Sequence, residues 1–257
     1  MNQRTYTYYR FVYFNSRGAG EIIRLLLCLP SNPPKWEDVR YPLTLSKNGF
    51  AIDTQYQKAK EDGAFACNMN QLPILQVVEL ENINEKQKIV RVDNIGQSHT
   101  IARFLASKHE LMGNGPMESA YIDNIYENVR DIKTKWFKEV KSSKDRYKAK
   151  KQWFDETLPD LCEKLEKSLP RQSTEKSNKS PWLVGSNVSL ADVAVYHLLS
   201  TSVSITSGST VSFFDGESEK LHQSYQKKCK RLDTCVKAVA AIPSIQSWEE
   251  RRPDTVS

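Results

Sequence analysis

In the first hundred residues, short apolar runs alternate with segments whose apolar residues recur at three- and four-residue spacings. Runs rich in aromatic and β-branched residues predict strands, and the wider spacings predict helices. The predicted strands cover residues 8–14, 36–40, 73–78 and 88–92, and the predicted helices cover 18–29, 54–62 and 97–108. The rest of 41–70 is expected to be loop. This order indicates a small α/β unit with a mixed four-stranded sheet.

After residue 113 the strand signal nearly disappears. A Gly-Asn-Gly-Pro stretch at 113–116 is typical of a linker, and helical periodicity follows it. Helices are predicted at 117–140, 152–169, 191–199, 217–241 and 244–252, with Pro159 expected to kink or split the second and a capping box of Ser189 and Asp192 before the third. The segments 171–180 and 201–216 are expected to be irregular. We therefore expect an α/β domain at 1–112 and an all-helical domain at 113–257.

Composition narrows the class of protein. The chain has no apolar run near the roughly 20 residues that a transmembrane helix needs, and its amino end lacks a signal-peptide core. Its five cysteines are scattered without a C-x-x-C pair, so we expect free thiols and neither a zinc site nor a redox dithiol. These features predict a cytoplasmic protein that does not interact with membranes.

The net charge of +6 raises the question of an anionic partner. Nine Lys or Arg residues lie between positions 133 and 151, against two acids, with aromatic side chains among them. Such a stretch can bind nucleic acid, but it is also typical of a long helix with a solvated basic face. We favour the solvated face and expect no nucleic-acid partner, although weak steering of a small anionic substrate is a further interpretation.

Five motifs in order carry a resemblance to a known family. They are YFNSRG at 13–18 with ExxR at 21–24, QLPIL at 71–75, QS at 97–98 followed by IARFL, SLAD at 189–192, and the end AIP…RRP at 241–253. Together they resemble the cytosolic glutathione transferases, in particular the sigma class, over nearly the whole chain. The resemblance implies a thioredoxin-like first domain that binds glutathione, and a helical second domain.

The resemblance implies that Tyr13 is the catalytic residue. A tyrosine at the end of the first strand can point its hydroxyl into a cleft, and a donor to sulfur favours thiolate, the reactive form of a thiol. From the residues alone, an ordinary strand aromatic packed in the core is the favoured interpretation of Tyr13, with Tyr8 and Tyr9 as local competitors. No covalent enzyme intermediate is needed.

The main chain at two places is expected to hold the peptide. If Pro73 is cis, as in the family, the main chain of Leu72 can pair with the cysteinyl part of glutathione, and Gln71 precedes it. At the predicted helix start, Gln97 and Ser98 suit the γ-glutamyl carboxylate because the first N–H groups of a helix are unbonded. The ordinary alternatives are a trans proline that begins a strand and a plain helix cap.

Three further contacts are implied by the resemblance and are less well anchored. Tyr56 and Lys60 have the spacing of the family's W-x-x-x-K pair, and Lys60 would meet the glycyl carboxylate. Asp131 falls where the family places an acid that reaches glutathione across a homodimer interface. Surface roles are the alternative for Lys60 and Asp131.

Two departures from the family bear on function. Ala19 stands where a related prostaglandin D synthase-type isomerase has an arginine, and Arg130 lies within the acid cluster that binds a divalent ion there. We therefore expect no metal and predict a glutathione transferase acting on an apolar electrophile, bound between Tyr13, Ala19 and residues 126–137. The isomerase and a non-catalytic, crystallin-like ligand-binding protein are the alternatives. Residues 171–180 and 201–219 resemble insertions.

Overall fold

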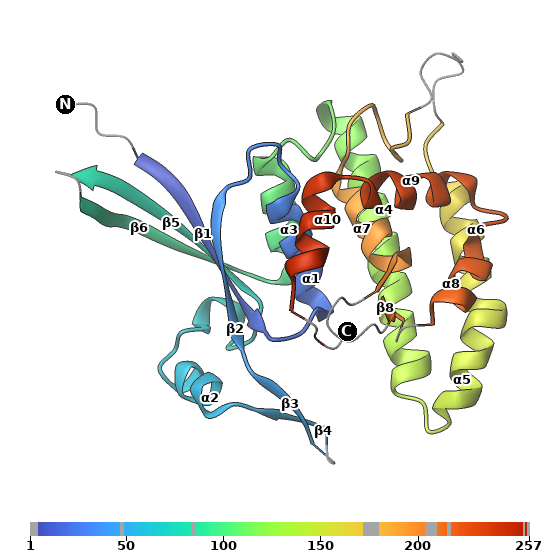
Figure 1. Ribbon diagram of the computed structural model, residues 1–257, viewed down its shortest axis with the longest axis horizontal. Coiled ribbons are helices and arrows are strands. Elements are labelled where there is room, and N and C mark those ends of the chain that lie inside the picture. The colour runs from blue at the N-terminus through green and yellow to red at the C-terminus, as the bar shows by residue number, and fades with distance from the viewer. Residues whose placement is uncertain are drawn as a thin grey trace. The chain divides into compact units, whose positions relative to one another are not determined.

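The computed structural model describes residues 5–46, 49–83, 86–171, 180–203, 210–214, 217–253 and 255 (Figure 1). Its contacts divide the chain into two compact units, one that ends at Leu105 and one that runs from Ala106 to Thr255. The division falls inside helix α3 (Ser98–Lys108), ahead of the linker from which we predicted a boundary at 112–113.

The first unit is built on a four-stranded sheet in the order β2-β1-β5-β6. These strands are β1 (Thr5–Phe14), β2 (Lys35–Tyr41), β5 (Ile74–Ile83) and β6 (Lys86–Gly96). β1 pairs in parallel with β2 and antiparallel with β5, and β5 and β6 form an antiparallel hairpin. The four strands are those predicted from the sequence, but the hairpin strands are longer. The sheet is therefore mixed, as expected.

The segment between β2 and β5 is more ordered than the sequence indicated. Helix α2 (Thr54–Glu61) lies where it was predicted, but an extra hairpin of β3 (Leu43–Ser46) and β4 (Gly49–Ile52) occupies part of the expected loop. The loop prediction for 43–52 was wrong, because strands this short carry little periodic signal. A short 3-10 turn (Ala66–Asn68) precedes β5.

Consecutive residues of β1 point to opposite faces of the sheet, and each face has its own core. Phe11 lies under the guanidinium of Arg24 from helix α1 (Glu21–Cys28), which follows a 3-10 turn at Gly18–Gly20. Val12 and Ile74, on the other face, pack in a buried cluster with Tyr56 of α2. Figure 1 shows α1 and α3 on the same side of the sheet. The aromatic and β-branched residues of this strand thus serve two cores.

The second unit is helical apart from the short hairpin β7 (Thr201–Val203) and β8 (Thr210–Ser212). Its helices are α4 (Gly115–Trp136), which continues as a π-helical turn (Phe137–Lys141), α5 (Arg146–Gln152), a second π-helical turn (Trp153–Thr157), α6 (Leu158–Ser168), α7 (Leu190–Leu199), α8 (Ser218–Tyr225), α9 (Lys230–Ala240) and α10 (Pro243–Arg251). The predicted 152–169 helix is thus divided just before Pro159. Most of the two expected irregular segments lies outside the described residues. Among the described helices, none combines the length and apolarity of a membrane span.

Helix α7 is the buried central helix of this unit, and its amino end is tied down by Asp192. The predicted capping box of Ser189 and Asp192 is present. The Asp192 carboxylate accepts hydrogen bonds from the Ser189 N–H at 2.8 Å, from the Ser189 hydroxyl at 2.6 Å and from the Leu183 N–H at 2.8 Å. It also accepts from the Cys235 thiol at 3.2 Å. One buried carboxylate therefore joins three segments of the helical unit.

We expect Asp192→Ala to lower the free energy of unfolding by about 3 kcal/mol, because buried donors lose a charged acceptor. Asp160→Ala is the matched control: Asp160 forms an exposed ion pair with Lys164 within α6, worth about 0.5 kcal/mol or less. Urea unfolding of the full chain measures both. Equal losses in the two variants would contradict the role assigned to the capping carboxylate.

Candidate functional site

Tyr13 is the penultimate residue of β1, near the strand end that precedes the glycine-containing turn, as the sequence predicted. Its ring stacks on Phe11 at 6.1 Å between centroids. The ring passes so close to Gly20 that a Cβ there would lie 2.6 Å from its Cδ1 atom, so only glycine fits. The Ala19 N–H donates to the Tyr13 hydroxyl oxygen at 3.3 Å. The turn thus fixes the ring and leaves the hydroxyl hydrogen available as a donor.

Burial raises the pKa of Tyr13, because a phenolate would lose solvation. The Ala19 N–H, the charge of Arg24 and the Ser16 hydroxyl act in the opposite direction but do not outweigh it. Tyr13 therefore stays a neutral phenol through the neutral pH range. A neutral phenol can donate a hydrogen bond to a thiolate, whereas a phenolate would repel it.

The turn after β1 is organised around the fully buried guanidinium of Arg24. Its Nη1 donates to the Ser16 carbonyl at 2.8 Å, and its Nε forms an ion pair with Asp38 at 3.0 Å. Glu21, one helical turn earlier, lies 3.5 Å from Nη1. Arg40 forms a second ion pair with Asp38 at 2.6 Å. The arginine of the ExxR motif is thus a structural charge that positions the turn beside Tyr13.

At the start of β5, the Leu72–Pro73 peptide bond is cis, as the family resemblance implied. The side-chain amide of Asn68, 4% exposed, donates to the carbonyls of Gln71 and Pro73, both at 3.0 Å. Among the described residues, none forms a hydrogen bond with the Leu72 main chain. The Leu72 N–H and C=O between two anchored carbonyls can therefore pair with an extended peptide.

The same asparagine also holds the start of α3. Its Oδ1 accepts from the Gln97 N–H at 3.1 Å, and Gln97 has a φ of 65°. A Cβ at residue 96 would lie 2.5 Å from the Asn68 Cβ, so Gly96 is required for this approach. Ser98 is the first residue of α3, as expected. The positive end of this helix can therefore receive a carboxylate beside the Leu72 main chain.

The remaining predicted contacts differ in what the structure places around them. Tyr56 is 6% exposed, and its ring stacks on Phe65 at 5.3 Å inside the aromatic cluster. Lys60 is exposed on α2. Asp131, in the second unit, has a side chain 75% exposed and lies 3.9 Å from Arg130. The contacts of all three with glutathione stay predictions, and the burial of Tyr56 leaves little of its ring to offer.

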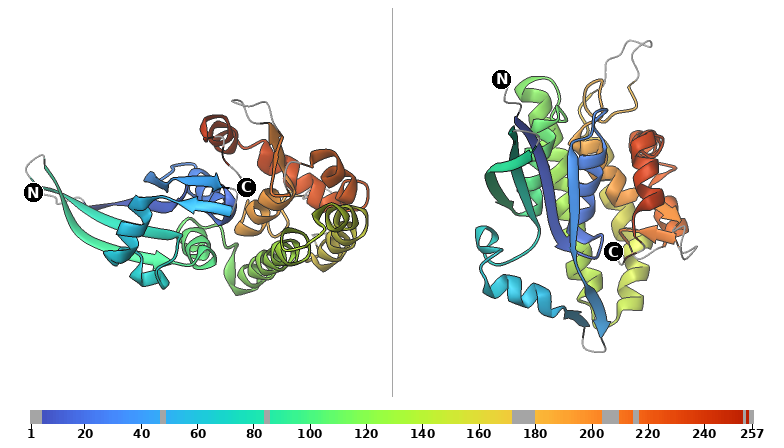
Figure 2. Two further views of the ribbon diagram at one scale, coloured as in Figure 1. Left: turned by 90° about the horizontal axis from the view of Figure 1, so that it is seen from below. Right: turned by 60° about the vertical axis from the view of Figure 1, so that its left-hand side comes forward.

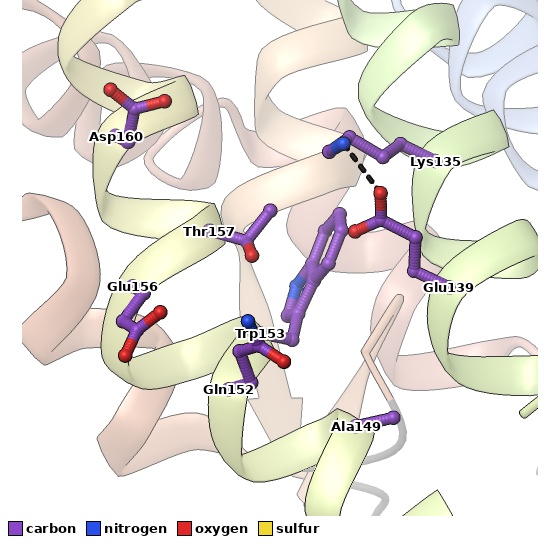
Figure 3. A pocket seen from close by; sticks show the side chains of 8 residues that line it. All are labelled: Lys135, Glu139, Ala149, Gln152, Trp153, Glu156, Thr157 and Asp160. Carbon is purple, nitrogen blue, oxygen red and sulfur yellow. Dashed lines mark hydrogen bonds and ion pairs between the residues drawn. The ribbon is translucent and has the colours of Figure 1, made fainter.

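Acidic residues of α4 lie beside basic ones, and a hollow opens between helices of the second unit. Glu127 forms an ion pair with Arg130 at 2.7 Å, and the described residues contain no group of three metal-ligating side chains. A hollow of about 600 Å³ lies between α4 and the π-helical turn before α6 (Figure 3). Trp153 lines it, and Lys135 and Glu139 form an ion pair across one wall. The polar side chains that line this hollow are not arranged for thiol chemistry.

Comparison with known proteins decides the family. The family model "Glutathione S-transferase, C-terminal domain" matches residues 130–252. Glutathione S-transferase 2 of Onchocerca volvulus is 31% identical over 196 residues, which cover 74% of this chain and 75% of that protein. The chain belongs to the glutathione S-transferase family.

Two further likenesses extend over both units of this transferase. Human hematopoietic prostaglandin D synthase is 27% identical over 251 residues, 96% of this chain and 98% of that protein. The crystal structure of a Caenorhabditis elegans glutathione transferase has a TM-score of 0.64 and 25% identity, and the match covers 97% of this chain and 99% of that one. The predicted fold class, a thioredoxin-like unit with a mixed four-stranded sheet followed by a helical unit, is confirmed. The transferase assignment is confirmed at the level of the family, and the sigma class is not.

Sequence reasoning missed the residue that joins the site. Asn68 connects the Leu72–Pro73 turn to the start of α3, yet it carries no motif of its own. The sequence offers two signals for Asn68: its position a few residues before the QLP motif, and the glycine at 96 just before the QS motif. The pairing of an amide side chain with a distant glycine is visible only in three dimensions.

We expect Arg24→Met to lower the free energy of unfolding by about 3–5 kcal/mol, because the buried Glu21 carboxylate and the Ser16 carbonyl lose a charged partner, while Asp38 keeps Arg40. Arg10→Met is the matched control, since its ion pair with Glu37 has side chains 42% and 49% exposed and is worth about 1 kcal/mol or less. Chemical unfolding followed by circular dichroism compares the two. A loss for Arg24→Met as small as that for Arg10→Met would contradict the organising role of Arg24.

Proposed function

We propose that this transferase activates glutathione through Tyr13, whose neutral hydroxyl donates a hydrogen bond to the tripeptide sulfur. The donor favours thiolate over thiol, and the thiol proton leaves to solvent. The thiolate then attacks an electrophilic carbon, forms the C–S bond and displaces a leaving group or adds to an activated double bond. The observation that carries this proposal is the Tyr13 hydroxyl, held by the Ala19 N–H at the end of β1.

The main chain supports the placement of the tripeptide. The open N–H and C=O of Leu72 match the main chain of a cysteinyl residue, as an added strand would. Ser98 and the first turn of α3 match the γ-glutamyl carboxylate. Both features lie in the first unit with Tyr13, and Asn68 links them. Gln71, Gln97 and Lys60 complete the proposed contacts.

The second substrate, the class, the cellular role and the oligomeric state follow as further parts of the proposal. We propose an apolar electrophile as second substrate, a sigma-like class and a role in detoxification in the cytoplasm. We also propose a homodimer, in which Asp131 of one protomer would reach the glutathione of its partner. The exposed carboxylate of Asp131 supports that last contact, because it is paired only at 3.9 Å with Arg130 among the described residues.

We expect Tyr13→Phe to lower the rate of conjugation with a generic aryl halide roughly tenfold to a hundredfold, because each unit of thiol pKa changes the thiolate fraction near neutral pH about tenfold. Glutathione affinity should change little. Titration of the thiolate absorbance of the bound tripeptide should show a raised thiol pKa in the variant. The wild-type rate should rise with pH through the thiol pKa of glutathione bound to the wild-type protein, without loss from phenol ionisation at neutral pH.

Tyr8→Phe is the matched control, because Tyr8 lies on the same strand but donates to Glu37 on the surface at 2.6 Å. It should leave the conjugation rate unchanged. Equal turnover by Tyr13→Phe and the wild type would refute the proposed role of Tyr13. Retention on a glutathione column without turnover of any electrophile would instead support a non-catalytic protein.

We expect Asn68→Ala to weaken glutathione binding about tenfold, equivalent to roughly 1.4 kcal/mol, because the two carbonyls and the Gln97 N–H lose their anchor. Asn94→Ala is the control. The Asn94 side chain, on the edge strand β6, accepts an exposed hydrogen bond from Gln76. Calorimetric titration measures both affinities. Unchanged binding by a folded Asn68→Ala protein would show that the site does not depend on this amide.

A second candidate function is isomerisation of a prostaglandin endoperoxide. It is favoured by the full-length similarity to the human prostaglandin D synthase. The Ala19 main chain supports Tyr13 whatever its side chain, so thiol activation alone does not separate the two reactions. Product analysis after incubation with the endoperoxide does, because the isomerase returns free glutathione and the transferase consumes it.

A further inference from the structure

The second unit holds an amine that the transferase mechanism does not use. Lys133, on α4, has its Nζ 2.9 Å from Nδ1 of His197 on α7 and 5.0 Å from the ring centroid of Phe213, which follows β8. Phe213 lies edge-on to His197 at 5.9 Å and to Phe137 at 6.0 Å. Figure 1 shows α4 and α7 beside each other, and they share the most extensive contact between helices of this unit. The amine thus lies against one aromatic ring and one imidazole.

The part of the chain that the structure describes places no carboxylate on this amine. Among the described residues, no carboxylate forms an ion pair with Lys133. The nearby acids of the same helix, Glu127 and Asp131, both lie against Arg130. Burial lowers the pKa of Lys133 to about 7. Near neutral pH, much of this amine is therefore unprotonated.

An unprotonated lysine amine is a nucleophile for carbonyl carbon. As a whole residue Lys133 is partly exposed, so an approach to its amine begins at the surface of the helical unit. The imidazole of His197 is placed to exchange a proton with Nζ, and the rings of Phe137 and Phe213 offer contact to an apolar tail. These are the parts that imine formation requires.

We propose that Lys133 and His197 form a covalent site for aldehydes with an apolar tail. The Nζ lone pair attacks the carbonyl carbon and forms the C–N bond, while the carbonyl π pair moves to oxygen. His197 takes one proton from nitrogen and returns it to the oxygen, which gives the carbinolamine. It moves the second nitrogen proton to the hydroxyl in the same way, and water leaves to give the imine. Amine and aldehyde thus yield imine and water, with no oxidant or reductant. The site is independent of the proposed thiol activation.

Lys135 is the matched control lysine. It lies two residues further along α4, and its ammonium forms an ion pair with Glu139, as Figure 3 shows. Its side chain is 43% exposed, so access to it is not the limit. A difference in labelling between Lys133 and Lys135 therefore reports the chemical state of the amine rather than its accessibility.

The test uses the full chain with benzaldehyde as probe and cyanoborohydride, which reduces the imine to a stable amine. Peptide mapping by mass spectrometry then locates the adduct. We expect Lys133 to be labelled at least about tenfold faster than Lys135 at neutral pH, since one pKa unit corresponds to tenfold in the free-amine fraction. The rate at Lys133 should rise with pH and reach half its maximum at about 7.

Variants sharpen the result. Lys133→Met should remove the fast adduct, Lys135→Met should leave it unchanged, and His197→Asn should slow it about tenfold while its half-maximal pH stays near that of the wild type. Because labelling is mapped by residue in the unaltered chain, the test does not depend on any variant folding. Equal labelling of Lys133 and Lys135, or a half-maximum near pH 10, would overturn the proposal. An unchanged rate in folded His197→Asn would overturn the part assigned to the imidazole.

Discussion

Arg24 carries a full positive charge into the interior of the first unit, and the turn after β1 is built around it. Burying a guanidinium costs several kcal/mol unless carboxylates and carbonyls surround it. Asp38 and the Ser16 carbonyl meet this requirement, and in doing so they fix the path of the chain past the ring of Tyr13. The position of the Tyr13 hydroxyl is therefore a consequence of the solvation of a buried charge.

Much of this architecture can be predicted from the sequence because apolar residues recur at regular local spacings. The strands of the main sheet and most helices follow from alternating or three- and four-residue apolar spacing, and the capping box at Ser189 follows from four consecutive residues. The β3–β4 hairpin escaped because its strands span four residues each. The π-helical turns also escaped, since one extra residue in a turn leaves the apolar pattern nearly unchanged.

Residues of the candidate site differ in the same way: those in local motifs are predictable from the sequence, and those defined by tertiary contacts are not. Tyr13, Leu72 and Ser98 were predicted because each belongs to a local motif at a strand or helix end. Asn68 was not found, although it binds the main chain on both sides of Leu72 and at the start of α3. Its partners are main-chain atoms, which leave no signature in residue types. Lys133 was likewise counted as part of a basic face, because only tertiary packing brings His197 and Phe213 to it.

The alternation along β1 restricts how this strand can change in length. Phe11 and Tyr13 face Arg24, while Val12 and Phe14 face the cluster around Tyr56. Inserting or deleting a single residue ahead of the turn would exchange the two sets, burying the phenol among hydrocarbon and presenting Phe14 in its stead. Related chains can therefore vary the outer end of β1 freely, but between Phe11 and the turn they are confined to an unchanged count or to steps of two.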